Sequence, residues 1–226
     1  MPIAIAHRGD PLTHRENTVP AFQSAERLGA DMVELDLRRT ADGEIVVLHD
    51  ATLSRLWGLD RSVADLDLVE LRSIGSDDRR IPTLGEVLRA VEIPLMVDFT
   101  GPEVVDGAVR AVRAADAIER SLFVTGHVGA LRRLRALAPE ARLGLTWITP
   151  EPPAPSLLHE LGAEFWNPMF QLVTGDNVTA LHALGCQVST WTVDEPTDMT
   201  RVAAAGVDAI VSNRIADLRR FLSASS

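Results

Sequence analysis

A short junction recurs along the chain and constrains its fold more than any other feature. At each occurrence a helical pattern ends in a glycine, and a short apolar run follows. The junction occurs as Arg27-Leu28-Gly29-Ala30, Glu160-Leu161-Gly162-Ala163, Ala183-Leu184-Gly185-Cys186 and Ala204-Ala205-Gly206-Val207. Glycine suits the left-handed position just past a helix C-terminus, and each following run is too short for a helix. The pattern therefore predicts repeated helix-to-strand units.

Further strand-like runs between these junctions bring the number of predicted strands to eight. They include residues 3–6, 95–99, 122–125 and 143–147, and helical patterns lie at 19–28, 103–115, 129–138, 179–184, 198–205 and 215–222. Strands that alternate with helices form parallel sheets, and eight such units in 226 residues favour a closed (β/α)₈ barrel, the TIM-barrel arrangement. The alternative is an open doubly wound sheet, but no glycine-rich dinucleotide loop follows the first strand.

A predicted hairpin in residues 30–50 interrupts the alternation. Residues 32–37 are apolar except at Glu34 and Asp36, and the two-residue period of a strand sends both carboxylates to one face. A second β-type run at 44–48 ends at His49, and Asp42-Gly43 between the runs is a turn signal. Antiparallel pairing, in which partner numbers sum to roughly 84 to 86, places His49 beside residues 35–37. Two carboxylates and a histidine would then lie together at the mouth of the predicted barrel.

We expect one domain over residues 1–226, with an insertion at about 38–83 after the second strand. An α/β barrel runs to about 200 to 250 residues as a single unit. Segment 52–83 is longer than an ordinary connection between strand and helix, and residues 65–71 within it have helical spacing. We therefore expect a small hairpin and helical insertion over the mouth, whereas the proline-rich segment 150–155 is interpreted as a connecting loop.

The net charge and the cysteine content limit which binding partners and which cellular compartment we expect. The chain has 32 acidic and 22 basic residues and a formal net charge of −10 at pH 7, which repels nucleic acid and anionic lipid surfaces. Every basic residue is arginine, so lysine chemistry is excluded. The one cysteine, Cys186, cannot form an internal disulfide. With neither a signal-peptide pattern nor an apolar run of membrane-spanning length, we expect a cytoplasmic protein without stable membrane association, whose oligomeric state the sequence leaves open.

Carboxylates stand at the ends of two predicted strands, where barrel enzymes carry their reactive residues. Glu34 and Asp36 lie on the second strand, and Asp98 lies near the end of the run at 95–99. Hard divalent ions such as Mg²⁺ or Ca²⁺ prefer oxygen donors of this kind. The three residues are therefore candidate ligands for a divalent metal.

Two histidines and an arginine complete a plausible set for phosphodiester hydrolysis. His7 and Arg8 follow the first strand, and His49 ends the hairpin. An arginine offers a planar fork that matches phosphate, and imidazoles exchange protons near neutrality. A metal and a guanidinium would neutralise the phosphate of a small-molecule substrate, while one histidine assists the attacking oxygen and the other protonates the leaving alkoxide.

Glu16 and Trp191 are supporting candidates, and each has an equally good structural explanation. Glu16 lies behind the His7-Arg8 loop, where it could hold Arg8 or a metal-bound water. Trp191 ends a strand, where it could wall a small organic group or pack in the core. Asn17 and Thr18 open a helix, so an ordinary helix cap explains both without any function.

These motifs together resemble the glycerophosphodiester phosphodiesterase family. The resemblance is carried by His7-Arg8-Gly9, Glu16-Asn17-Thr18, Gly29-Ala30-Asp31 followed by Glu34 and Asp36, Thr40 with Asp42-Gly43, and His49-Asp50. Weaker matches extend it to nearly the whole chain, at Ile81-Pro82-Thr83-Leu84, Trp191-Thr192-Val193 and Gly206-Val207-Asp208. It implies a TIM barrel, a His7 and His49 acid-base pair, and a divalent metal on Glu34, Asp36 and a later carboxylate. The implied reaction cleaves deacylated phospholipid headgroups to glycerol 3-phosphate and an alcohol, with the glycerol hydroxyl, rather than water, attacking first.

The chain departs from the family pattern in three segments. The chain has Asp98-Phe99-Thr100 where Glu-x-Lys is usual, Asp194 where Asn is usual, and Ser212-Asn213-Arg214-Ile215 where Thr-Asp-x-Pro is expected. Position 100 thus lacks its cation, and losing a charged hydrogen bond there would cost about 1.5 to 3 kcal/mol. Two alternatives stay open: a catalytically impaired barrel that binds a phosphorylated ligand, and a lyase-like enzyme that makes a cyclic phosphate from lysophospholipid.

Overall fold

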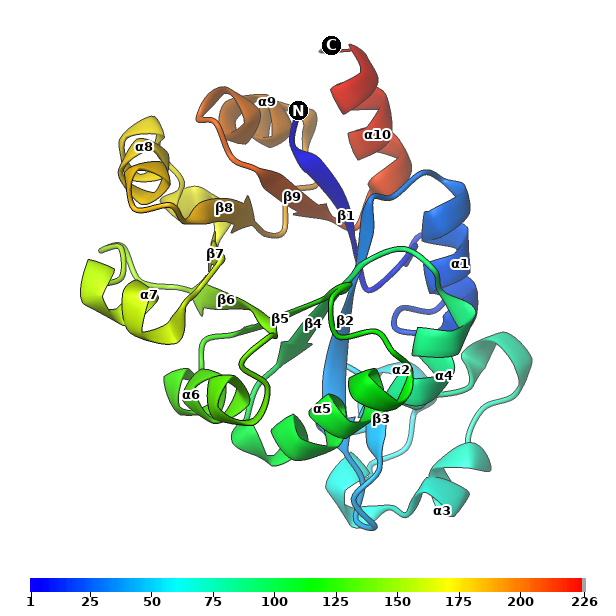
Figure 1. The fold of residues 1–226 in the computed structure, drawn as a ribbon. Helices are drawn as coiled ribbons and strands as arrows, with labels where there is room; N and C mark the ends of the chain where they lie inside the picture. Colours follow the sequence, from blue (N-terminus) through cyan, green and yellow to red (C-terminus); the bar gives the residue numbers. More distant parts are fainter. Residues whose placement is uncertain (225–226) are drawn as a thin grey trace.

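The computed structural model describes residues 1–224 and shows a closed barrel of eight parallel strands (Figure 1). Around the barrel the order is β1-β9-β8-β7-β6-β5-β4-β2, and pairing of β1 with β2 closes the ring. The fold is thus the predicted TIM barrel and not an open sheet. The barrel strands are β1 (Ile3–His7), β2 (Met32–Arg39), β4 (Leu95–Phe99), β5 (Ser121–Thr125), β6 (Arg142–Trp147), β7 (Phe165–Pro168), β8 (Gln187–Thr190) and β9 (Ala209–Ser212).

Helices surround these strands (Figure 1). They are α1 (Val19–Arg27), α4 (Leu84–Ala90), α5 (Val105–Ala114), α6 (Val128–Leu137), α7 (Pro155–Leu161), α8 (Gly175–Ala183), α9 (Pro196–Ala204) and α10 (Ile215–Ala224), with the 3₁₀ turns η3 (Pro102–Val104) and η4 (Phe170–Leu172) between them. All four junction glycines have the predicted positive φ, between 56° and 91°. Helix α8 begins earlier than the predicted residue 179, because Thr174 caps it by accepting the Asn177 N–H at 3.2 Å.

The predicted hairpin is present beside β2. Strand β3 (Ile45–Val47) pairs antiparallel with β2, with Leu37 opposite Val47 and Arg39 opposite Ile45, which is the predicted register. The short elements α2 (Ser54–Trp57), η1 (Val63–Asp65), α3 (Leu68–Arg72) and η2 (Asp77–Arg79) follow. This segment has an apolar cluster of its own, formed by Val46, Leu48, Leu53, Val63, Leu66, Leu71 and Ile81.

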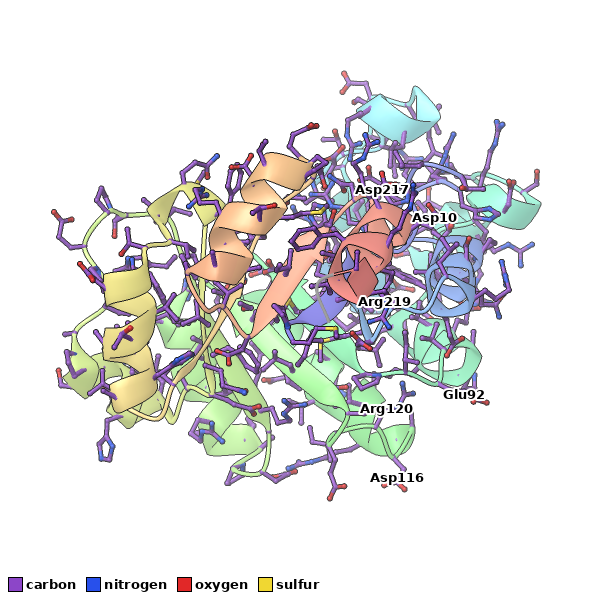
Figure 2. All side chains as sticks on the ribbon, turned by 90° about the horizontal axis from the view of Figure 1, so that it is seen from above. Asp10, Glu92, Asp116, Arg120, Asp217 and Arg219 are labelled. Atoms are coloured by element: carbon purple, nitrogen blue, oxygen red, sulfur yellow. The ribbon has the colours of Figure 1, made fainter. Side chains whose placement is uncertain are left out.

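The first and last parts of the chain are joined beneath the barrel. The carboxylate of Asp31, just before β2, accepts the Ala4 N–H of β1 at 2.8 Å. The same Asp31 oxygen accepts Nη1 of Arg219 at 2.9 Å, and Figure 2 shows Arg219 on α10. This contact fixes α10 against the two strands whose pairing closes the ring.

Apolar side chains fill the barrel interior below the strand ends. Ile5, Met32, Met96, Leu122, Val124, Phe165, Ala209 and Val211 form this cluster, and a larger core lies between the strands and the helices. The barrel is therefore a packed support for residues at its mouth. Within residues 1–224, the helices are all too short or too polar to cross a bilayer.

Candidate active site

A cavity of about 640 Å³ opens at the C-terminal ends of the barrel strands. Its lining includes every predicted site residue except Glu16. The lining residues are His7, Arg8, Glu34, Asp36, His49, Met96, Asp98, Phe99, Thr100, Thr125, Gly126, His127, Thr146, Trp147, Ile148, Thr149, Asn167, Trp191 and Val211. The carboxylates and the arginine all come from β1, β2 and β4 or the turns after them, so the charge is concentrated on one side.

A tight turn after β1 presents His7 and Arg8 to the cavity. Arg8 has a φ of 58°, and its backbone N–H donates to Oε2 of Glu34 at 2.9 Å. Gly9 follows with a φ of 87°, and a Cβ atom there would lie 2.6 Å from the carbonyl carbon of Ala21. Only glycine tolerates both the left-handed backbone and this close approach. The His-Arg-Gly sequence thus builds the turn as well as supplying its side chains.

The Arg8 guanidinium lies between two carboxylates. Nη1 donates to Oε1 of Glu16 at 2.8 Å, and Nε lies 3.2 Å from Oδ2 of Asp36. Nε is buried and has no hydrogen-bond partner among the described residues. Of the two roles considered for Glu16, the geometry shows the contact with Arg8. Glu16 therefore stands behind the cavity wall and orients the arginine.

The three predicted metal ligands lie on adjacent strands, where they crowd negative charge. Asp36 and Asp98 are direct partners in the register of β2 with β4. Burial, followed by the charges of Asp36 and Asp98, raises the pKa of Glu34 well above its usual value. Burial, and then the charge of Asp36, raises the pKa of Asp98 to about 8. A bound cation would relieve the cost of ionising this group.

The donor set suits a hard divalent ion, because all three groups are carboxylates. Across residues 1–224, however, no three carboxylate, imidazole or thiol groups already surround a common point as a metal cluster. Glu34 is engaged by the Arg8 backbone, and Asp36 lies against the Arg8 guanidinium. Ion binding would therefore require the carboxylates to turn toward a shared position.

Asn17 contributes to the site, so its interpretation as an ordinary helix cap was wrong. Its Nδ2 donates to Oδ2 of Asp36 at 2.7 Å, and the Asp36 N–H donates back to Oδ1 at 3.2 Å. Asn17 has a φ of 59°, which asparagine tolerates better than most residues. Thr18 is the actual cap of α1 and accepts the Ala21 N–H at 3.4 Å. The two-way contact sets the orientation of Asp36.

His49 is held through a chain of ion pairs that reaches Arg8. Nδ1 of His49 lies 2.7 Å from Oδ1 of Asp50, and Oδ2 of Asp50 accepts Nε of Arg55 at 2.6 Å. Arg55 also donates to Oε1 of Glu16 at 2.6 Å, and Glu16 holds Arg8. Hydrogen bonding from Arg55 is the main cause that lowers the pKa of Asp50 to about 2. The sequence did not indicate Arg55, which reaches the site from α2.

Arg38 places a cation near position 100, where the sequence predicted none. Its Nη1 donates to Oγ1 of Thr100 at 3.0 Å, and its Nε donates to the backbone oxygen of His49 at 2.9 Å. The charge of Arg38 also lowers the pKa of Asp98, although burial outweighs it. An arginine on β2 thus contacts the residue at the position where the resemblance led us to expect a lysine on β4.

His7 contacts an amide, and that amide contacts a carboxylate. Nδ1 of His7 lies 2.8 Å from Oδ1 of Asn213, whose Nδ2 donates to Oδ2 of Asp194 at 2.8 Å. Nε2 of His7 lies 3.9 Å from Oε2 of Glu34. Burial, and then the charge of Arg8, lowers the pKa of His7. Asp194 and Asn213 are two of the positions at which the sequence departs from the family pattern.

Trp191 both lines the cavity and packs on the barrel interior, so its two interpretations are compatible. Its indole Nε1 donates to the backbone oxygen of Asn167 at 3.0 Å. Trp147 lies on the same side of the mouth, with Nε1 2.7 Å from the backbone oxygen of Glu151. Nothing in the local sequence distinguishes Trp147 from the last residue of an ordinary buried strand.

The chain is similar to known proteins along nearly its whole length. The model of the Glycerophosphoryl diester phosphodiesterase family matches residues 7–217. A glycerophosphodiester phosphodiesterase of Caldanaerobacter subterraneus is 29% identical, and the alignment covers 93% of each chain. A protein of Mycobacterium tuberculosis named probable glycerophosphodiester phosphodiesterase 2 is 33% identical over 96% of this chain and 89% of its own.

A solved structure has the same fold. The Oleispira antarctica phosphodiesterase in complex with the product sn-glycerol-3-phosphate matches with a TM-score of 0.91 and 23% identity. The match covers 99% of this chain and 97% of that chain. At this identity the comparison shows the barrel fold alone.

Proposed function

Because the chain belongs to the glycerophosphoryl diester phosphodiesterase family and is a phosphoric diester hydrolase, we propose that it cleaves glycerophosphodiesters to glycerol 3-phosphate and an alcohol. The observation that carries this substrate class is the placement of His7, His49 and Arg8 on one cavity with three carboxylates. The product in the Oleispira antarctica neighbour, sn-glycerol-3-phosphate, supports it.

Arg8 is the proposed phosphate-binding residue. One of its Nη1 hydrogens is held by Glu16, and its buried Nε lies against Asp36. The Nη2 hydrogens and the second Nη1 hydrogen are left for phosphate oxygens. Glu34, Asp36 and Asp98 would hold Mg²⁺ or Ca²⁺, which when bound supplies charge to neutralise the phosphate. Asn17 would keep Asp36 aligned for that role.

The different partners of the two histidines suggest their roles. The Asp50 carboxylate contacts Nδ1 of His49 and would compensate the charge of an imidazolium, as an acid requires. Asn213 offers His7 only an uncharged amide, and burial lowers the His7 pKa, which favours the neutral base. We assign His7 to the attacking oxygen and His49 to protonation of the leaving alkoxide.

The test is turnover of glycerophosphocholine and glycerophosphoethanolamine by the purified protein with Mg²⁺, Ca²⁺ or Mn²⁺. We expect glycerol 3-phosphate release that chelator abolishes and that re-added metal restores. Asp98→Asn should need a higher metal concentration for half-maximal rate. The proposed substrate class would be wrong if no tested ion supported release, and the metal dependence would be wrong if chelator had no effect.

A lyase-like reaction on lysophospholipid is a second candidate, and one observation favours it. The side of the cavity opposite the carboxylates carries Trp147, Ile148 and Trp191, and Ile148 is 67% exposed. An acyl chain could cover this apolar surface. Phosphorus NMR of the products of lysophosphatidylcholine distinguishes the two reactions, since only the lyase releases a cyclic phosphate.

A further inference from the structure

We propose that Asp194 and Asn213 form a positioning pair that fixes the tautomer and orientation of His7. Asp194 sets the direction of the Asn213 amide, and the amide sets which ring nitrogen of His7 carries the hydrogen. This inference rests on the proposed role of His7 in the reaction. It concerns geometry, and it assigns a role to two residues that do not line the cavity.

The Asp194 carboxylate gathers three donors at the ends of β8 and β9. Its Oδ1 accepts the Asn213 backbone N–H at 2.8 Å and the Ser212 hydroxyl at 3.0 Å. Its Oδ2 accepts Nδ2 of Asn213 at 2.8 Å. A carboxylate can only accept, so the nitrogen of the Asn213 amide must face Asp194. The two ends of this amide therefore cannot exchange places without losing a hydrogen bond to a charged group.

The fixed amide then constrains His7. Its oxygen, Oδ1, lies 2.8 Å from Nδ1 of His7, and an amide oxygen can only accept, so Nδ1 must carry the hydrogen. In the neutral ring Nε2 then keeps its lone pair. Nε2 lies on the Glu34 side of the ring, 3.9 Å from Oε2, and the His7 side chain is only 16% exposed. The lone pair of a proton acceptor is thereby directed toward the carboxylate side of the cavity.

His49, the other histidine of the site, has a different kind of partner. Of the two histidines, only His7 has an amide between its ring and a carboxylate. Nδ1 of His49 contacts the Asp50 carboxylate directly, with no amide between them. At His7 the order along the chain of contacts is imidazole, amide, carboxylate. Exchanging the two residue types would keep the number of donors and acceptors and would place the carboxylate against the ring instead.

Three variants test the pair. In Asp194→Asn the Asn213 backbone N–H keeps the new amide oxygen at the Oδ1 position, so the new amide nitrogen faces the Asn213 amide and reverses it. In Asn213→Asp two carboxylates face one another. Each single variant should lower kcat by about 10- to 100-fold, because the hydrogen bonds that orient the His7 ring are lost, with KM changed less than about twofold. The combined exchange restores one donor opposite one acceptor and again places an acceptor against Nδ1, so it should restore the single tautomer of His7 with the hydrogen on Nδ1.

Imidazole ¹⁵N NMR at one fixed pH gives a readout that a merely structural role would not move. We expect the wild-type protein to show His7 with the hydrogen on Nδ1. In Asp194→Asn the reversed Asn213 amide would donate to Nδ1, so we expect the hydrogen to move to Nε2. Asp208→Asn is the matched control, since Asp208 contacts His182 at 2.8 Å at the opposite end of the strands, and it should leave kcat unchanged. Circular dichroism identifies a temperature at which all variants are folded.

The outcomes separate this inference from the proposed function. Unchanged kcat and tautomer in Asp194→Asn, together with an inactive His7→Ala variant, would overturn the pair and leave the function standing. An exchanged variant whose His7 tautomer differs from that of the wild-type protein would also overturn the pair. Full activity in His7→Ala would instead remove the proposed role of His7 itself.

Discussion

Arg38 Nη1 donates to the hydroxyl of Thr100 at 3.0 Å, although the two residues lie 62 positions apart. The contact joins the end of β2 to the end of β4, on the side of the cavity that holds Asp98. It gives this chain a guanidinium in a region where the sequence alone indicated a missing cation.

Removing the Arg38 guanidinium should impair activity more than it impairs folding. If the Arg38 guanidinium makes one charged hydrogen bond to the phosphate in the transition state, its loss in Arg38→Ala costs about 1.5 to 3 kcal/mol, which is a decrease in kcat/KM of about 10- to 150-fold. Arg39→Ala is the matched control, because Arg39 is the next residue on β2 and is exposed. Steady-state kinetics of both variants check this, and equal rates for the two would contradict it.

Arg55 should matter to the reaction without mattering to stability. It is 46% exposed, and exposed ion pairs contribute about 1 kcal/mol or less to the free energy of unfolding. Yet Arg55→Ala releases both Glu16 and Asp50, so the supports of Arg8 and His49 loosen together. We expect kcat to fall about tenfold or more.

Arg61→Ala is the control for Arg55, since Arg61 pairs with Glu70 elsewhere in the same insertion. Thermal unfolding should give nearly the same midpoint for both variants. A large loss of stability with unchanged kcat in Arg55→Ala would show that these ion pairs stabilise the insertion and do not support the reaction.

The raised pKa of Asp98 predicts how pH affects the metal-free protein. The pKa rises from an ordinary 3.8 to about 8 in the folded state, so between these values the folded chain binds more protons than the unfolded chain. The free energy of unfolding therefore falls as pH rises from about 4 to 8. Denaturant titrations at pH 5, 6.5 and 8 with chelator should show this decline, and Asp98→Asn should flatten it.

A divalent ion should counter this decline in the free energy of unfolding with rising pH. If Mg²⁺ or Ca²⁺ binds the ionised carboxylates, the stabilisation by metal grows with pH and binding releases protons. Repeating the titrations with saturating metal measures the difference. An identical decline with and without metal would contradict a site on these residues.

Cys186 should be inert to thiol reagents in the folded protein. The residue is only 3% exposed, and burial is the main cause that raises the pKa of its thiol to about 11. Because the thiolate is the reactive form, native protein at pH 8 should react with Ellman's reagent far more slowly than unfolded protein. Rapid labelling without unfolding would contradict the buried, protonated thiol.

The sequence predicted the barrel because its signals are local. Each glycine past a helix marks a junction by its own conformation, and the turn at Asp42-Gly43 fixes the register that brings His49 beside residues 35–37. Patterns of this kind need only neighbouring residues. The same holds for the carboxylates, since strand alternation places Glu34 and Asp36 on one face.

The supporting residues were missed because they act across long sequence distances. Arg38 and Arg55 have long flexible side chains, and nothing in their local sequence shows which partner they reach. Asn17 looked like a helix cap because it directly precedes the true cap, Thr18. The roles of Asn213 and Asp194 emerge only when β8 and β9 lie side by side. Such contacts follow from the fold and were not visible before it.

The assignment of His7 as base and His49 as acid is tested most directly by changing the leaving group. A p-nitrophenyl glycerophosphodiester releases an alcohol that needs no protonation, whereas glycerophosphocholine releases one that does. His49→Ala should lose activity on glycerophosphocholine by about 100-fold or more but retain most of it on the p-nitrophenyl ester, while His7→Ala should lose both. Equal losses on the two substrates in both variants would contradict the acid-base pair.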